Sequence, residues 1–209
     1  MNKRLQAWDD SLDEDQYRRL DQSLTRRQFL VRSTRTLTAF TLSPALVSLA
    51  ACSEQPAHDQ QTLVQQEPWR TFAVVQQQLF PDDGNGPSAM DLNAALYLKF
   101  VLEAEDTDQD DRAFIDKGID WLNDLAQDTL NQVFAACSYA QQTELVSEIA
   151  KSRAGERWLA FLLTYIFEAL LTDPVYGGNP NGIGWQWLQH QPGFPHPPKE
   201  KIYTELLKR

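Results

Sequence analysis

The stretch GERWLAFLLTYIFEALL, residues 155–171, decides the fold class of this chain. Its apolar side chains cover most faces of a helix, which is typical of a helix buried at the centre of a domain. The uncharged part, residues 158–167, is only ten residues long, whereas a membrane-spanning helix needs roughly 20 apolar residues. The stretch therefore predicts a buried central helix and not a transmembrane span.

Helical spacing also precedes this stretch. Apolar residues recur every three or four positions in segments 69–79, about 89–102, 114–125 and about 141–151. A loop rich in proline and glycine, residues 81–87, separates the first two segments, and no alternating run is long enough for a strand. We therefore predict an all-α fold: a single compact helical domain over residues 68–209, after a cleavable N-terminal signal (1–51) and a polar tether (52–67).

Composition and charge narrow the class of protein. The chain has 209 residues, of which 42% are hydrophobic, enough for one globular domain with its own core. The formal net charge of -10 argues against a nucleic-acid partner. Residues 1–51 carry 8 Lys and Arg against 6 Asp and Glu, whereas residues 52–209 carry 11 against 23. This contrast predicts two segments with different fates.

The segment SLTRRQFLVRSTRTLTAFTLSPALVSLAAC, residues 23–52, has the order of a secretory signal. A positive region is followed by a mildly apolar region and by small residues. Its start, TRRQFLV, resembles the twin-arginine (Tat) pattern S/T-R-R-x-F-L-K, with Val31 at the last position. We therefore predict export by the Tat translocase, with a signal carried by Arg26, Arg27, Phe29 and Leu30.

The end of this segment, Leu49-Ala50-Ala51-Cys52, resembles a bacterial lipobox. In that interpretation the chain is cut before Cys52, whose thiol carries lipid and anchors the protein to the membrane. The alternative is an ordinary signal with a chance cysteine. The second cysteine, Cys137, is predicted to be a small core residue, and two cysteines exclude a disulfide framework.

A partly acidic extension, residues 1–22, precedes the twin arginines. Its apolar residues Leu5, Trp8, Leu12 and Tyr17 predict a short amphipathic helix. The extension either binds an export chaperone or reflects a start codon assigned too early.

Metal and cofactor patterns are incomplete in this sequence. Asp106, Asp108 and Asp110 have EF-hand spacing, but Asp111 and Lys117 stand where that loop needs glycine and glutamate. His190 and His196 have no cysteine or clustered carboxylate between them, as a metal site would need. There is no haem-attachment motif and no dinucleotide fingerprint. We expect no catalytic residue, metal or cofactor in this chain.

The segment DPVYGGNPNGIGWQWL, residues 173–188, holds four of the nine glycines together with three aromatic residues. Either this loop folds back over its own helices, or it forms a docking surface, since Tyr and Trp are favoured at interface centres. The residues assigned to the docking surface are Tyr176, Gly177, Gly178, Asn179, Gly184, Trp185 and Trp187.

Two segments resemble a known family, the small subunit (subunit 3) of membrane-associated gluconate 2-dehydrogenase. The first is WRTFAVVQQQLFPDDGNGPSAMDLNAALYL, residues 69–98, which is similar to the opening of the family. The second is DPVYGGNPNGIGW, residues 173–185, which is similar to its most specific motif. The resemblance covers roughly residues 68–197, and a twin-arginine leader is common in the family.

The resemblance implies a non-catalytic accessory subunit of an oxidoreductase complex. The large partner of such a subunit holds FAD and oxidises a sugar or sugar acid, and a c-type cytochrome often receives the electrons in its haem. The small subunit stabilises the flavoprotein and carries it through the Tat pore, so that the complex faces the periplasm. The alternative is a stand-alone envelope lipoprotein that acts as a binding module.

Overall fold

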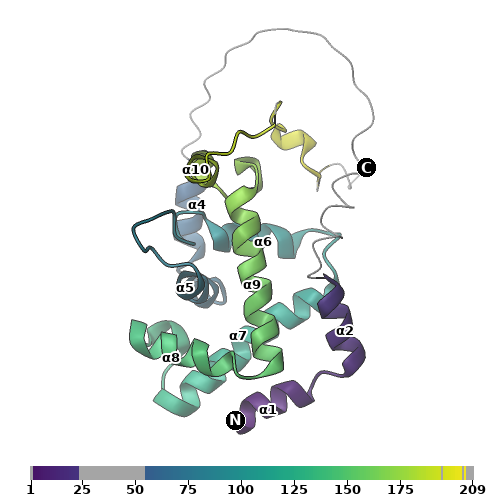
Figure 1. The fold of residues 1–209 in the computed structure, drawn as a ribbon, viewed down its shortest axis with the longest axis vertical. Coiled ribbons are helices and arrows are strands. Elements are labelled where there is room, and N and C mark those ends of the chain that lie inside the picture. The colour runs from purple at the N-terminus through teal and green to yellow at the C-terminus, as the bar shows by residue number, and fades with distance from the viewer. Residues whose placement is uncertain (1, 24–54, 194, 204, 206–209) are drawn as a thin grey trace.

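The computed structural model describes residues 2–23, 55–193, 195–203 and 205, which form helices joined by loops (Figure 1). These residues include no β-strand, which confirms the predicted all-α fold. Within the same ranges, no helix is both long and apolar enough to span a membrane. The helices are α1 (Lys3–Asp10), α2 (Glu14–Ser23), α4 (Gln55–Leu63), α5 (Trp69–Leu79), α6 (Ala94–Glu103), α7 (Gln109–Leu130), α8 (Tyr139–Ile149), α9 (Arg153–Leu171) and α10 (Ile183–Trp187), with 3₁₀ turns η1 (Phe134–Ala136), η2 (Pro174–Tyr176), η3 (Pro180–Gly182) and η4 (Lys199–Lys201).

Helix α9 runs through the middle of the molecule and carries the core (Figure 1). It contacts α1, α5, α6, α7 and α10. Trp158, in its second turn, has no exposed surface, and its indole N–H donates to the Ile115 carbonyl of α7 at 2.9 Å. The predicted central helix is therefore confirmed. It begins two residues earlier than predicted because the Ser152 hydroxyl accepts the Gly155 N–H at 3.0 Å and caps the first turn.

The other predicted helices are present, some with shifted ends. Helix α5 has the predicted bounds. Helix α6 begins at Ala94 and not near residue 89, because Asn93 has a left-handed φ of 54° that a right-handed helix cannot contain. Helix α8 begins two residues before the predicted start, because Ser138 and Gln141 form a capping box there.

Residues 2–23 form two helices that belong to the core, whereas the sequence predicted one short amphipathic helix. We call α1 and α2 the N-terminal helix pair. Leu5, Trp8, Tyr17 and Leu20 are at most 4% exposed, and all four join the main apolar cluster with residues of α7 and α9. The pair lies against one end of α9 (Figure 1).

The segment predicted to be a polar tether contains α4, which contacts α6. The side chain of Gln60 is 4% exposed, and its Nε2 donates to the Met90 carbonyl at 2.8 Å. Helix α4 therefore lies on the domain. Residues 52–54 are outside the described ranges, so the tether stays a prediction there.

A smaller apolar cluster lies where α6 meets the C-terminal half of α9. Its buried members are Ala89, Leu92, Ala94, Ile166, Ala169 and Leu170. The loop of residues 173–188 begins directly after this cluster, so the cluster determines where the loop sits.

Candidate functional site

The loop of residues 173–188 covers the C-terminal end of α9, and α10 lies beside that end (Figure 1). The last carbonyls of a helix have no partner within the helix. Here the loop supplies donors: the Trp185 indole N–H donates to the Leu171 carbonyl, and Asn179 Nδ2 donates to the Thr172 carbonyl, both at 2.9 Å. The loop therefore completes the helix that it covers.

Asn179 holds the loop together. It has no exposed surface and a left-handed φ of 50°, a conformation that asparagine tolerates better than most residues. Its Oδ1 accepts the Gly184 N–H at 2.7 Å, and its own N–H donates to the Leu92 carbonyl at 3.0 Å. Asn179 thus joins the end of α9, the start of α10 and the turn that precedes α6.

Two of the predicted loop glycines have a clear structural reason. A Cβ atom on Gly184 would lie 2.2 Å from the Leu170 carbonyl oxygen, so only glycine permits α10 to approach α9 this closely. Gly177 has a φ of 93°, which side chains disfavour. Gly178 is also buried, and a Cβ atom on it would lie 3.0 Å from the Ala169 carbonyl oxygen of α9.

The three predicted aromatic residues are fixed on one side and open on the other. The Trp187 indole N–H donates to the Asn85 carbonyl at 2.8 Å, yet the residue is 43% exposed. The ring of Trp185 stacks on His196, with 5.7 Å between ring centroids. Tyr176 is half-buried. Aromatic side chains held in this way lose little further freedom when a partner covers them.

Trp187 is part of a larger exposed surface that the sequence analysis missed. The Phe80 ring meets Phe167 at 6.1 Å and Trp187 at 6.4 Å, in both cases edge to face. Phe167 is 45% exposed and Leu171 is 54% exposed, and their spacing of four places them on one side of α9. We call these four residues the aromatic patch. The available signal was residues 155–171 themselves, which are apolar on more faces than one core can cover.

A buried polar contact joins α6 to α9 near the loop. The Tyr97 hydroxyl donates to Glu168 Oε2 at 3.1 Å. Burial raises the pKa of the Glu168 carboxyl, and the Tyr97 hydrogen bond offsets only part of that rise. Burial also raises the pKa of Tyr203 to about 12, and the Tyr203 ring meets Tyr176 at 5.7 Å. Burial therefore disfavours the charged forms of the phenols and of the carboxyl.

A shallow groove of about 570 Å³ runs between the loop and the segment that follows it. Trp185, Gln186 and Gln189 line it, together with Asp173 and His196, whose Oδ2 and Nδ1 atoms lie 2.5 Å apart. The described residues that line the groove include no serine, threonine, cysteine or lysine to serve as a nucleophile. The groove therefore offers aromatic and polar contacts for binding.

The remaining predicted site residues have separate outcomes. Arg26, Arg27, Phe29, Leu30 and Cys52 lie outside the described residues, so the Tat signal and the lipid site stay predictions. Cys137 is 6% exposed within the main cluster, which confirms its predicted place in the core.

The metal patterns that the sequence analysis rejected have structural roles. Asp108 caps α7, because its Oδ1 accepts the Asp110 N–H at 2.8 Å. In the described part of the chain, no three His, Cys, Asp or Glu residues gather in a group that could hold a metal ion.

Comparison with known proteins identifies the family. The family model described as gluconate 2-dehydrogenase subunit 3 matches residues 66–193. Searches of curated proteins and of solved structures found no significant match. The matched range covers more than half of the chain. It contains α5 to α10, the loop of residues 173–188 and the whole aromatic patch, and it leaves out α1, α2 and α4. The chain therefore belongs to the gluconate 2-dehydrogenase subunit 3 family.

Proposed function

We propose that this chain is the non-catalytic small subunit of a FAD-dependent sugar or sugar-acid dehydrogenase, which it stabilises and helps to export. The family name, which describes a subunit of a dehydrogenase, supports an accessory role. The observation that carries the proposal is the aromatic patch, which includes Trp187 of the loop of residues 173–188. The FAD belongs to the large partner, and a c-type haem to a cytochrome partner.

The patch and the loop have the properties of a docking surface. Contiguous exposed apolar side chains are typical of protein interfaces, and aromatic side chains supply much of the binding energy at interface centres. Phe167 and Trp187 leave 45% and 43% of their surface exposed, and each contacts the ring of Phe80. The flavoprotein would cover these rings and the loop between residues 173 and 188.

The docking proposal is tested by co-expression with the proposed FAD-containing large subunit. Phe167→Ala should remove a central contact and weaken the complex by about 2 kcal/mol if it is a hot spot, measured as flavin that co-purifies with the subunit. Tyr139→Ala, which alters a 62% exposed aromatic residue on α8, is the matched control and should change nothing. Equal flavin recovery with both variants would contradict the proposed surface.

The export part of the proposal is tested at the twin arginines. A variant with both Arg26→Lys and Arg27→Lys should keep this chain in the cytoplasm, because the Tat receptor recognises the arginine pair. A flavoprotein that lacks its own signal should stay behind with it. Unchanged export of the double variant would refute the Tat assignment.

Anchoring is tested at Cys52. Acyl chains hold a protein on a bilayer because each buried CH₂ contributes about 0.8 kcal/mol. In Cys52→Ala, labelled fatty acid should no longer be incorporated, and the protein should be recovered as uncut precursor or in the soluble fraction. Labelling of the variant equal to that of the unaltered protein would show that Cys52 does not carry the lipid.

A further inference from the structure

Apolar contacts hold the N-terminal helix pair on the face formed by α7 and α9. The Trp8 ring stacks on Trp121 of α7, with 5.8 Å between centroids and 8° between planes. It meets Trp158 of α9 at 6.3 Å with its edge. Leu5 has no exposed surface, and Leu20 is 4% exposed. Removing the pair would therefore expose several large apolar side chains of the domain.

Asp9 completes the first turn of α9 from the helix pair. The first N–H groups of a helix lack partners within the helix, and negative charge is favourable beside them. Asp9 Oδ1 accepts the Ala154 N–H at 2.7 Å, and Oδ2 accepts the Arg153 N–H at 3.3 Å. Asp9 lies 145 positions from Ala154 in the sequence, and it supplies partners for two N–H groups of the first turn in addition to the Gly155 N–H that Ser152 caps.

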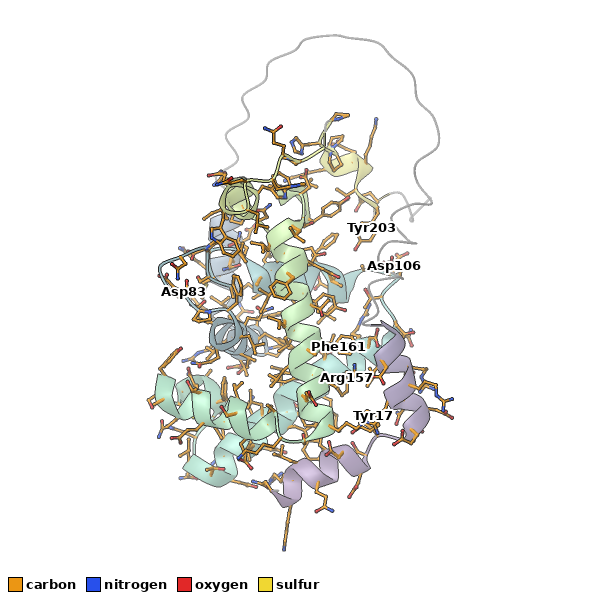
Figure 2. All side chains as sticks on the ribbon, in the orientation of Figure 1. Tyr17, Asp83, Asp106, Arg157, Phe161 and Tyr203 are labelled. Carbon is orange, nitrogen blue, oxygen red and sulfur yellow. The ribbon has the colours of Figure 1, made fainter. Side chains whose placement is uncertain are left out.

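On α9, two arginines bind acidic residues of the helix pair. The Arg153 guanidinium donates to both carboxylate oxygens of Glu14, at 2.7 and 3.4 Å, and lies 3.8 Å from the centroid of the Tyr17 ring. Arg157 forms an ion pair with Asp21. Figure 2 shows Arg157 and Tyr17 where α9 faces the helix pair.

On α7 the signs of the charges are reversed. Asp124 and Asp128 bind Arg4, at 3.1 and 3.0 Å, and Asp110 lies 3.4 Å from Arg19. Exposed ion pairs contribute little stability. A pattern that is cationic on α9 and anionic on α7 does, however, determine how an oppositely patterned segment docks.

We propose that the joined face of α7 and α9 is a binding surface for residues 2–23, and that it keeps the N-terminal helix pair attached after the chain is cut ahead of the domain. The apolar contacts, the cap on α9 and the matched charges are all non-covalent, so none of them requires an intact segment 24–54. The family match over residues 66–193 leaves out the helix pair, so the pair lies outside the part of the chain that the family model describes.

The cut itself rests on the proposed function, since it would be hydrolysis of the bond before Cys52 by the signal peptidase. The binding surface does not rest on it. If both hold, the mature protein is a complex of two polypeptides, in which the former leader still contributes Trp8 and Asp9 to the fold.

The test uses the full chain with a site for a sequence-specific protease in place of residues 36–41. After cutting, the N-terminal fragment should elute with the rest of the protein in gel filtration. Elution of the fragment by itself, or precipitation of the remainder without it, would overturn the proposal.

Variants separate specific docking from general stickiness. Trp8→Ala should weaken retention of the fragment at least about 30-fold if Trp8 is a hot spot, whereas Gln6→Ala on the exposed side of α1 should not weaken it. Asp21→Lys should also weaken retention, and adding Arg157→Glu should restore most of it. A swap that restores nothing, or equal effects of Trp8→Ala and Gln6→Ala, would contradict the proposed surface.

Mass spectrometry of the exported protein then distinguishes the two proposals. Recovery of residues 1–51 as a separate peptide in the purified complex would support both. An uncut chain would refute processing before Cys52 but not the surface, provided that the fragment stays bound in the engineered protein. A cut chain without the peptide would refute retention of the helix pair in the exported protein, and release of the fragment from the engineered protein as well would refute the surface.

Discussion

The two ends of the described chain use aromatic side chains differently. Near the N-terminus, Trp8 and Tyr17 are 1% and 3% exposed and form part of the core. Near the C-terminus, Trp187 has its indole N–H bound to the Asn85 carbonyl, yet it is 43% exposed. Each segment contains both tryptophan and tyrosine, so the presence of these residue types does not by itself tell which rings are buried. Aromatic area covered within the chain stabilises the fold, and aromatic area left exposed is available to a partner.

The largest effect on stability is expected for an aromatic side chain that is buried within the chain. Trp8→Ala removes a buried ring between Trp121 and Trp158. We expect a loss of about 3–5 kcal/mol in the free energy of unfolding and a fall in Tm of about 6–20 °C for a chain of this size. Thermal unfolding of the full chain measures both. Gln6→Ala is the control. A Tm for Trp8→Ala equal to that of the control would show that the buried Trp8 ring does not stabilise the fold.

The next effect concerns the hydrogen bonds that hold the C-terminal loop. Asn179→Ala leaves the Gly184 N–H and the Thr172 carbonyl without their side-chain partner, at a cost of about 2–4 kcal/mol for two buried groups. Asn181 has a similar φ of 55° but an exposed side chain. Asn181→Ala therefore carries the backbone strain without the lost hydrogen bonds. Equal free energies of unfolding for Asn179→Ala and Asn181→Ala would show that backbone strain alone explains the lost stability.

The third prediction tests whether the exposed aromatic area serves a partner. Trp187→Ala should weaken the complex with the flavoprotein by about 2 kcal/mol if Trp187 is a hot spot. The subunit alone should lose only about 1 kcal/mol, the typical value of the hydrogen bond to Asn85. Co-purification and thermal unfolding separate these quantities. A fall in Tm as large as for Trp8→Ala, with unchanged partner affinity, would assign this ring to the domain's own core. Tyr176→Ala and Trp185→Ala extend the same test along the loop.

The smallest effect concerns how the free energy of unfolding depends on pH. The contributions of Glu14 and Glu168 to this dependence should have opposite signs. Arg153 lowers the pKa of Glu14 in the helix pair below its usual 4.5, so the stability from this contact is present above that value and is lost as the pH falls through the lowered pKa. Burial raises the pKa of Glu168 above 4.5, so the stability from its protonated form is present below 4.5 and is lost as the pH rises through the raised pKa.

Two variants test these opposite signs by urea unfolding at a series of pH values. Glu168→Gln should remove the loss of stability above pH 4.5, because the amide stays neutral. Glu14→Gln should remove the loss below that value. If both variants changed the pH profile on the same side of 4.5, the two ends of the molecule would not differ electrostatically in the way proposed.

Much of the fold could be predicted because it is encoded locally. The spacing of Trp69, Phe72, Val75 and Leu79 gave the bounds of α5, and the apolar run of residues 155–171 gave the central helix. Helix ends shifted where one side chain decided them, as with the left-handed Asn93 ahead of α6. The docking of α1 and α2 could not be predicted, because Trp8 packs on Trp121 and Trp158, which are more than 100 positions away.

The candidate site was predicted only in part, for a similar reason. The loop of residues 173–188 has an unusual local composition, so glycine and aromatic residues marked it. Phe80 and Phe167 join Trp187 only in three dimensions, and each by itself has the sequence pattern of an ordinary core residue. Exposure depends on what the rest of the chain covers, and the spacing of apolar residues does not encode it.

The contact between Asp9 and α9 also has a consequence for the order of events during synthesis. The hydrogen bond joins positions 145 residues apart, so at about 5–20 residues per second the ribosome needs about 7–30 s to make the second position after the first. The N-terminal helix pair is therefore made first but cannot complete its docking until α9 has been made. For that interval Leu5 and Trp8 lack the surface that later buries them. An export chaperone that held the pair during this interval would be displaced when α9 emerged, so chaperone binding and the docked fold would follow one another in time.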